Sequence, residues 1–364
     1  MEATITRRRW FLASAAALAA RTAPAQVHQE IRALAERAPL RMQFRGGTAA
    51  ECRQWQQAFA AKLRELLGPH SPPARWETIT ERSVDAEDHR REELLLRAEG
   101  HRDLPVHLLL PRGSSGKRAA VLALHGHGAF GHDAVAGIAT TPERAKSIAG
   151  ANYDYGLQLA RRGYVVAVPC FTPFGRRLDD PKAYGGDDPC AVTFVRMQLL
   201  GKVLMAENLR DALWALELLA RREDVDPDRL GCVGLSYGGR MAMLTAALEP
   251  RIRVVVISGA LNVMQERIRG RYSCGAQVIP GLLEYGYEPE IASLIAPRPC
   301  LWEVGRQDSL MVKEWIEPAL ERIRRAYRAL GALDKLRVDS FDGGHRWNGV
   351  EAYPLLAEVL SSSR

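Results

Sequence analysis

The fold is decided by one stretch of the sequence, Gly231-Cys232-Val233-Gly234-Leu235-Ser236-Tyr237-Gly238-Gly239-Arg240-Met241. The apolar residues before Ser236 predict a short buried strand, and the run from 241 to 248 predicts a helix. Between them, Gly234 and Gly238 remove Cβ atoms that would collide in a very tight turn. Such a turn exposes the serine hydroxyl at the carboxyl end of its strand. We interpret Ser236 as a candidate nucleophile, with an ordinary strand-to-helix turn as the alternative.

Around this stretch, the sequence alternates between strand and helix patterns from residue 118 onward. Strands are predicted at 119–124, which is wholly apolar, and at 164–169, 230–234, 253–258, 300–304 and 336–341. Amphipathic runs between them predict helices at 153–162, 196–222, 313–330 and 352–360. This alternation favours a mostly parallel central sheet with helices on both faces, which is an α/β fold.

The preceding part of the chain has a different pattern. Residues 26–74 are predicted to form a helical N-terminal extension, because apolar residues recur there every three to four positions. Three strands are then predicted at 76–81, 93–97 and 104–110, as an antiparallel edge of the sheet. We therefore divide the chain into the extension and one main domain, residues 75–364.

The first 25 residues are predicted to be a targeting segment. They contain Thr6-Arg7-Arg8-Arg9-Trp10-Phe11-Leu12, which resembles the twin-arginine (Tat) export signal, followed by an alanine-rich apolar run. Ala23-Pro24-Ala25 fits the small-residue rule for cleavage, so residues 1–25 are expected to be removed. The run is too short for a stable membrane span. We expect a periplasmic or secreted protein; a basic N-terminus followed by a short helix is the alternative.

The composition is that of an ordinary globular protein. The 364 residues are 47% hydrophobic and 26% charged, and three of the seven net positive charges lie in the first 25 residues. The mild remaining charge gives no nucleic-acid signature. The six cysteines show no metal-binding spacing. Cys170 and Cys190 bracket one loop, and whether they form a disulfide is left open.

A serine nucleophile needs a general base, and the base needs an acid that orients it. His345 follows the last predicted strand in Asp342-Gly343-Gly344-His345, where two glycines give a turn able to aim the ring over the sheet. Asp308 follows the strand at 300–304 in Gly305-Arg306-Gln307-Asp308. Each residue alone could be an ordinary loop residue. Together with Ser236, in this order and each after its own strand, they predict a Ser-His-Asp triad.

The oxyanion of an acyl-transfer intermediate needs backbone donors. One is the N–H of Tyr237, directly after the serine. The second is expected in Leu124-His125-Gly126-His127-Gly128; we assign the N–H of His127, and Gly128 is the alternative. A competing interpretation makes His125, His127 and His132 metal ligands. The Asp-His that would follow His-x-His in metallo-hydrolases is missing, so we expect no metal and no cofactor.

From about residue 90 to 360 the chain resembles the α/β-hydrolase superfamily, in the branch of dienelactone-hydrolase-like and acetyl-xylan-esterase-like exported bacterial esterases. The resemblance rests on His125-Gly126-His127-Gly128, Gly234-Leu235-Ser236-Tyr237-Gly238-Gly239, Ala296-Pro297-Arg298-Pro299, Gly305-Arg306-Gln307-Asp308 and Asp342-Gly343-Gly344-His345. True dienelactone hydrolases use cysteine, whereas this chain has Ser236, which favours simple esters. The resemblance implies carbohydrate deacetylation.

These observations lead to the hypothesis of a serine esterase that acts on a small-molecule or carbohydrate ester. A serine peptidase of the prolyl-oligopeptidase kind is an alternative, although about 90 residues before the catalytic region are too few for a propeller domain. A catalytically silent binding protein is another. Two long segments, 170–195 and 261–289, are expected to shape the pocket or merely to cover the sheet edge. Acyl length, alcohol and oligomeric state are left open.

Overall fold

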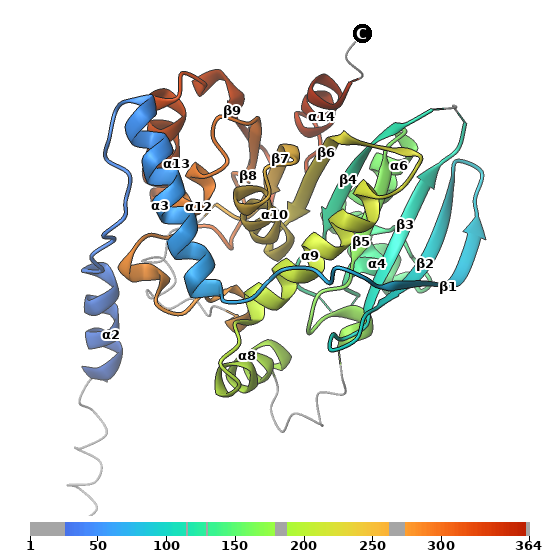
Figure 1. Ribbon diagram of the computed structural model, residues 1–364, viewed down its shortest axis with the longest axis horizontal. Helices are drawn as coiled ribbons and strands as arrows, with labels where there is room; N and C mark the ends of the chain where they lie inside the picture. The colour runs from blue at the N-terminus through green and yellow to red at the C-terminus, as the bar shows by residue number, and fades with distance from the viewer. Residues whose placement is uncertain (1–25, 114–115, 129, 179–187, 262–273, 362–364) are drawn as a thin grey trace, which may run out of the picture.

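A computed structural model describes residues 26–113, 116–128, 130–178, 188–261 and 274–361 (Figure 1). One nine-stranded sheet runs through it in the order β1-β2-β3-β5-β4-β6-β7-β8-β9. The strands are β1 (Glu77–Asp85), β2 (His89–Arg97), β3 (Leu104–Pro111), β4 (Arg118–Leu124), β5 (Val165–Pro169), β6 (Val225–Leu235), β7 (Ile252–Ser258), β8 (Cys300–Gly305) and β9 (Leu336–Phe341). The predicted signal peptide lies outside the described residues.

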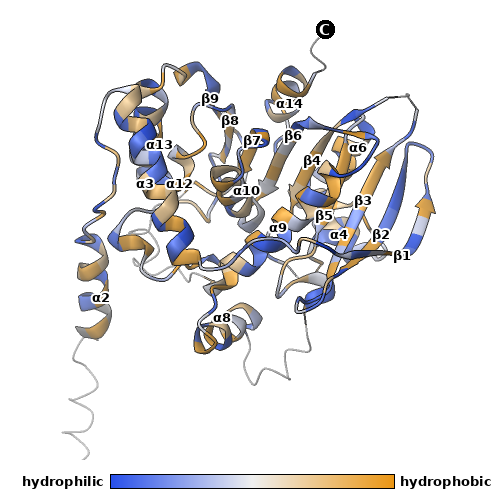
Figure 2. Ribbon diagram, viewed as in Figure 1, coloured by the Kyte–Doolittle hydropathy of each residue, from blue (hydrophilic) through white to orange (hydrophobic). Residues whose placement is uncertain are grey.

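The sheet has an antiparallel edge and a parallel centre. Strands β1, β2 and β3 pair antiparallel, and β3 also pairs antiparallel with β5. From β5 through β4, β6, β7 and β8 to β9 every pairing is parallel. The central strands are buried on both faces and mainly apolar, whereas β1 is largely exposed (Figure 2). The predicted α/β-hydrolase architecture, with its antiparallel N-terminal edge, is confirmed.

Helices cover both faces of the sheet. On one face a buried core joins α3 (Ala49–Leu67), α9 (Leu204–Ala220), α10 (Tyr237–Leu248), α12 (Glu288–Ser293) and α13 (Lys313–Ala329) to the strands. On the other face a second core joins α4 (His132–Val135), α6 (Tyr155–Arg161) and α14 (Ala352–Leu360). Three further helices are α2 (Gln26–Glu36), α5 (Pro142–Ala151) and α8 (Pro189–Leu199). Because parallel strands end at the same edge, this arrangement collects their following loops there.

The helical extension packs onto the first of these two cores. Helix α3 begins with a capping box, in which the Glu51 N–H donates to Thr48 Oγ1 at 3.3 Å and the Thr48 N–H donates to Glu51 Oε2 at 2.9 Å. Phe59, Leu63 and Leu67 on one face of the helix are buried, and α3 contacts α12 and α13 (Figure 1). Burying these three side chains contributes roughly 1.5–3 kcal/mol each, which holds the extension against the sheet.

The long helix expected at 196–222 is wrong, because the structure has two helices there. Helix α8 ends at Leu199, α9 begins at Leu204, and the two meet at 98°. Gly201 lies between them with φ +66°, and the Lys202 N–H turns back to Met197 O at 2.8 Å. Leu199, expected on the buried face, is 82% exposed.

In the described part of the chain, no single helix combines the length and apolar character of a membrane span. The bent pair α8 and α9 reaches those limits only when the two helices are taken together. Helix α9 is mostly buried against the sheet, as expected for a core helix.

Candidate active site

Ser236 occupies a strained turn between β6 and α10. Its backbone has φ +63° and ψ −123°, a conformation that a non-glycine residue rarely adopts. The turn is possible because its neighbours are glycines: a Cβ on Gly238 would lie 1.9 Å from Leu124 O, and one on Gly234 would lie 2.2 Å from Gly238 O. The Ser236 N–H donates to Ser258 O at 2.9 Å, which ties the turn to the end of β7. The predicted strand–turn–helix around Ser236 is present.

The structure brings Asp308 and His345 together, although 37 positions separate them in the chain. Asp308 follows β8 and is 3% exposed, and His345 follows β9. His345 Nδ1 lies 2.7 Å from Asp308 Oδ2, and the other carboxylate oxygen accepts the Leu310 N–H at 2.8 Å. Both carboxylate oxygens are therefore occupied. The acid can fix the ring's tautomer, with Nδ1 protonated and Nε2 left to act as a base.

The ring of His345 lies over the end of β7, beside the serine turn. A Cβ placed on Gly259, the residue after β7, would lie 2.9 Å from His345 Cε1 and 3.2 Å from Leu235 Cδ1. Leu235 directly precedes Ser236, so the ring and the turn share the space that Gly259 leaves open. Gly259 has φ +57°, which also favours glycine at this position.

The loops that carry the acid and the base support each other through their backbones. The Gln307 N–H donates to Gly343 O at 2.9 Å, and a Cβ on Gly305 would lie 2.5 Å from Gly344 O. This close approach explains the glycine at position 305. Of the two glycines before His345, a Cβ on Gly343 would lie 2.6 Å from Phe341 Cε2, whereas one on Gly344 would meet only Gln307 O, at 3.9 Å. The contact between the two loops holds the ring at a defined distance from Asp308.

Glu303, a residue that the sequence analysis left aside, anchors the far side of the His345 loop. It is fully buried in β8, where Oε1 accepts the Gly349 N–H at 2.7 Å and Oε2 accepts the Asn348 N–H at 3.1 Å. Burial raises the pKa of Glu303 to about 7, against the lowering effect of these two hydrogen bonds. Its place inside a strand gave no signal of this role, because the partners come from a distant loop.

The loop after β4 lies against the serine from the other side. A Cβ on Gly126 would lie 3.0 Å from Ser236 Cβ. The Gly126 N–H is already donated to the Tyr153 hydroxyl at 2.7 Å, so the next amide along, that of His127, is the candidate oxyanion donor. The N–H of Tyr237 lies in the first turn of α10, where amides have no partner within the helix. The loop that carries His127 thus lies beside Ser236, and the assignment of the His127 and Tyr237 amides as oxyanion donors stays a prediction.

The three histidines proposed as alternative metal ligands do not converge. His125 is fully buried; its Nε2 accepts the Phe171 N–H at 2.9 Å and its Nδ1 lies 2.8 Å from Gly126 O. Burial lowers the pKa of His125 to about 4, so the ring is neutral and structural. His132 stacks instead on His107, with ring centroids 4.2 Å apart.

The cysteines are arranged differently from the pair considered in the sequence. All six are free thiols in the structure. Cys170 Sγ donates to Phe174 O at 3.1 Å, whereas Cys190 lies beside Cys274, from the second long segment. The middles of both long segments, 179–187 and 262–273, lie outside the described residues, so the expectation that they shape the pocket stays a prediction.

A polar link joins the serine turn to the start of the first long segment. Asn208 Nδ2 donates to the Tyr237 hydroxyl at 2.7 Å and to Thr172 O at 2.8 Å, while its Oδ1 accepts the Thr172 N–H at 3.0 Å. Sequence reasoning missed Asn208 because it lies in the middle of α9, where it looks like any other helix residue.

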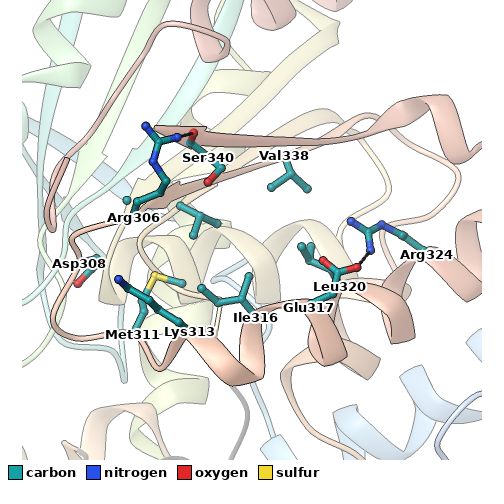
Figure 3. Close-up of a pocket in the computed structure, with 12 residues that line it drawn as sticks. Arg306, Asp308, Met311, Lys313, Ile316, Glu317, Leu320, Arg324, Val338 and Ser340 are labelled. Atoms are coloured by element: carbon teal, nitrogen blue, oxygen red, sulfur yellow. Dashed lines mark hydrogen bonds and ion pairs between the residues drawn. The ribbon is translucent and has the colours of Figure 1, made fainter. Parts of the chain in front are cut away.

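A cavity of about 380 Å³ lies between β8, β9 and α13 (Figure 3). Its lining includes the apolar side chains Met311, Ile316, Leu320 and Val338, and Asp308 lies at one end. Neither Ser236 nor His345 lines it. The cavity therefore borders the acid and does not adjoin the serine.

The fold and the arrangement of these loops define the class of the protein, an α/β-hydrolase. The chain belongs to the dienelactone hydrolase family. The model of that family matches residues 146–269. A Bacillus subtilis (strain 168) protein named "Putative hydrolase YtaP" is 32% identical over 299 residues, which cover 78% of this chain and 92% of that protein.

Solved structures of low sequence identity share the fold. One is described as a putative acetyl xylan esterase from Bacteroides fragilis NCTC 9343, with TM-score 0.72, 18% identity and coverage of 88% of this chain and 83% of the other. A glucuronoyl esterase from Solibacter usitatus has TM-score 0.64 and 13% identity, covering 89% of this chain and 97% of the other. These two likenesses show a shared fold, and the family match and the Bacillus subtilis relative support a hydrolase.

Proposed function

We propose that this protein is a serine esterase in which Ser236, His345 and Asp308 form the catalytic triad. The observation that carries the proposal is the 2.7 Å pairing of His345 Nδ1 with Asp308. The ring of His345 lies over Gly259, beside the strained serine turn. A turn that costs of order 1–3 kcal/mol persists only where the surroundings hold it in place. A hydroxyl presented by such a turn, with an oriented base beside it, is the arrangement that acyl transfer needs.

In the proposed reaction Ser236 Oγ attacks the carbonyl carbon of the ester while His345 Nε2 takes its proton. The tetrahedral intermediate places its negative oxygen between the N–H groups of Tyr237 and His127. It collapses as His345 returns the proton to the leaving alcohol, leaving an acyl group on Ser236. Water, deprotonated by the same ring, then releases the carboxylic acid and restores the serine.

Asp308 acts throughout by stabilising the imidazolium form of His345. It is almost wholly shielded from water, so its charge is poorly screened and its attraction to the charged ring is strong. Its second oxygen is held by the Leu310 N–H at 2.8 Å, which prevents the carboxylate from rotating away from the ring.

For the substrate we propose small acyl esters of carbohydrates. Support comes from the structural neighbour described as a putative acetyl xylan esterase. The neighbour described as a glucuronoyl esterase gives the alternative, an ester whose acid carries the sugar. A panel of acetylated sugars, uronic acid methyl esters, and short- and long-chain p-nitrophenyl esters separates the possibilities; preference for the long-chain esters would contradict the carbohydrate assignment.

The nucleophile is tested by hydrolysis of p-nitrophenyl acetate. Ser236→Ala should lower kcat by about 10⁴-fold or more, because the triad residues act as a unit. Ser340→Ala, which changes an exposed serine on β9, is the matched control and should behave as wild type. A fluorophosphonate should label the wild type at Ser236 and leave Ser236→Ala unlabelled.

The same labelling separates the alternative functions. Absence of labelling would favour a silent binding protein. Labelled protein that cleaves aminoacyl-proline amides and no acetyl ester would favour a peptidase.

We also propose that the protein acts after export, in the periplasm or outside the cell, because residues 1–25 resemble a twin-arginine signal. N-terminal sequencing of protein recovered from the producing cells should then start at Gln26. A start at Met1 in the mature protein would contradict export with cleavage.

A further inference from the structure

One histidine and two cysteines, side chains that can bind a transition-metal ion, meet beside the candidate active site from three separate parts of the chain. His127 follows β4, Cys190 lies in the first turn of α8, and Cys274 directly precedes the short helix η2 (Gly275–Gln277). One ligand atom from each residue lies within 4.8 Å of the other two. Both thiols are buried, at 6% and 7% exposure, whereas His127 is exposed to solvent. The two sulfur atoms thus lie on the buried side of the cluster, and the His127 ring lies on its solvent side.

The chemistry of the three side chains matches a tetrahedral metal ion. Thiolate sulfur and neutral imidazole nitrogen are the ligands that zinc-like cations prefer, with metal–ligand distances of about 2.3 Å and 2.0 Å. Tetrahedral geometry then requires donor separations of roughly 3.3–3.8 Å. The three ligand atoms lie within 4.8 Å of one another, so the side chains and the backbone that carries them must close a gap of up to about 1 Å to reach these separations.

One backbone donor already points at the Cys274 sulfur. The Ala276 N–H donates to Cys274 Sγ at 3.3 Å. A negative sulfur at this position therefore has one donor directed toward it.

A side chain that can hold a water molecule as the fourth metal ligand is also present. Gln277 Nε2 lies 3.5 Å from His127 Nε2, so this amide reaches the cluster. Its Oε1 is buried and has no hydrogen-bond partner among the described residues. An oxygen in that place can accept a hydrogen bond from a water molecule bound to the metal.

We propose that His127, Cys190 and Cys274 bind one zinc-like divalent cation, with a water held by Gln277 in the fourth position. Binding deprotonates both thiols, so one cation enters and two protons leave. The site is distinct from the triad, because it contains neither Ser236, Asp308 nor His345.

The cation is expected to inhibit the enzyme, an effect that rests on the proposed esterase function. The backbone N–H of His127 is the proposed oxyanion donor, and its ring packs on Tyr237 and Phe174 with centroids 5.2 Å and 5.3 Å away. Drawing the ring about 1 Å toward the two sulfurs moves this amide, and a displacement of that size can cost about 100-fold in rate. We expect kcat to fall at least tenfold when the site is filled.

Binding is tested directly on the full mature chain, reduced with a phosphine and kept free of oxygen. Co²⁺ should bind one ion per chain, with near-ultraviolet sulfur-to-cobalt charge transfer and the intense visible bands of tetrahedral cobalt, and Zn²⁺ should abolish both. X-ray absorption of the zinc-loaded wild type should show two sulfurs at about 2.3 Å. Zinc bound only by nitrogen and oxygen would overturn the proposal without any variant being made.

Variants then assign the ligands. Cys190→Ala and Cys274→Ala should each lower affinity for Co²⁺ at least 100-fold and weaken the charge-transfer band. Cys52→Ala, which removes a buried thiol elsewhere in the core, should bind as wild type. Thermal unfolding of each variant without metal shows whether it is folded. Unchanged binding by a folded Cys274→Ala would overturn the assignment.

Inhibition is measured last, on p-nitrophenyl acetate, with each variant compared with its own metal-free rate. Wild type and Cys52→Ala should be inhibited at the Zn²⁺ concentration that fills the site, and Cys274→Ala should not. If no ester is hydrolysed, the spectroscopic tests still decide on the metal site. A Cys190–Cys274 disulfide in the isolated protein, together with no metal uptake after reduction, would assign the pair to a covalent bridge instead.

Discussion

His125 and His345 occupy comparable places, each in a glycine-containing loop after a strand of the parallel part of the sheet, yet the structure gives them opposite characters. His125 is fully buried, and two backbone groups occupy its nitrogens at 2.9 Å and 2.8 Å. The side chain of His345 is 25% exposed, one nitrogen faces a carboxylate at 2.7 Å, and the other remains for chemistry. The difference lies in the hydrogen-bond partners of each ring: the carbonyl of Gly126 and the distant Phe171 amide for His125, and the distant Asp308 carboxylate for His345.

This difference shows what makes a histidine able to act as a base. A ring with both nitrogens bound to the backbone can neither accept nor deliver a proton without breaking a hydrogen bond. Burial then keeps it neutral, as for His125, whose pKa falls to about 4. A carboxylate on one nitrogen orients the ring and stabilises its charged form, which is the situation of His345.

Making the same substitution at both positions gives the sharpest contrast. His345→Gln should lower kcat for p-nitrophenyl acetate by about 10⁴-fold, because glutamine cannot take the serine proton. The unfolding midpoint should stay close to wild type, since the lost ring is partly exposed. Less than a tenfold loss would show that His345 is not the base.

Glu303 is the support that His345 has and His125 lacks, and it should make stability depend on pH. Its pKa of about 7, against an ordinary 4.5, means that the folded state keeps a proton that the unfolded chain loses between these values. The resulting stabilisation is complete below about pH 4.5 and is lost as pH rises to about 7, by roughly 3 kcal/mol.

Glu303→Gln removes this titration. Urea titrations at pH 4.5 to 8 give the free energy of unfolding of wild type and of Glu303→Gln. As pH rises, the wild type should therefore lose stability relative to Glu303→Gln. Glu358→Gln, a change at an exposed carboxylate, provides the control. Curves for wild type and Glu303→Gln that stay parallel would contradict the raised pKa.

Gly259 tests whether the space over β7 is what positions His345. Gly259→Ala puts a methyl group 2.9 Å from His345 Cε1, so the ring must move, and kcat should fall about 100-fold. Gly331→Ala is the matched control: Gly331 has φ +66°, close to the +57° of Gly259, but a Cβ there meets nothing within 4 Å. Both variants carry the same backbone strain. Equal kcat values would show that strain alone, and not the ring, was affected.

The smallest effect on activity is expected at the structural ring. His125→Gln keeps one acceptor and one donor in poorer geometry, so the free energy of unfolding should fall by about 1–2 kcal/mol. Its kcat should drop less than tenfold, in contrast to His345→Gln. Chemical denaturation and p-nitrophenyl acetate kinetics measure both values. A loss of kcat as large as that of His345→Gln would place His125 in the chemistry.

Most of the central sheet could be predicted because each strand there carries its own signal. The runs at 119–124 and 253–258 fall inside β4 and β7, since strands buried on both faces are mainly apolar. The run at 336–341 coincides with β9, an edge strand that is only partly buried and alternates apolar with polar residues. The break between α8 and α9 was missed because Leu199 continues the apolar spacing across Gly201. A single glycine inside a periodic pattern is tolerated in many helices, so local sequence could not decide the matter.

The candidate site likewise contains features that could be predicted from local sequence and features that could not. The turn at Ser236 could be read locally, because its glycines answer a steric demand that lies within a few residues. The role of Glu303 and the link through Asn208 could not, because hydrogen-bond partners in distant loops create them. The proximity of Cys190, Cys274 and His127 could not be predicted either, because no spacing in the sequence indicates that these three segments meet.

The sequence by itself determined the alternation of strand and helix, the tight turn at Ser236, and the order in which Ser236, Asp308 and His345 follow their strands. These features depend on apolar periodicity and on glycine sterics, which act over a few residues. Only the tertiary structure decided that His345 meets Asp308, that His125 is buried and neutral, and which cysteines are neighbours. Burial and electrostatic pairing depend on what surrounds a group in space, and the packing of distant segments supplies those surroundings.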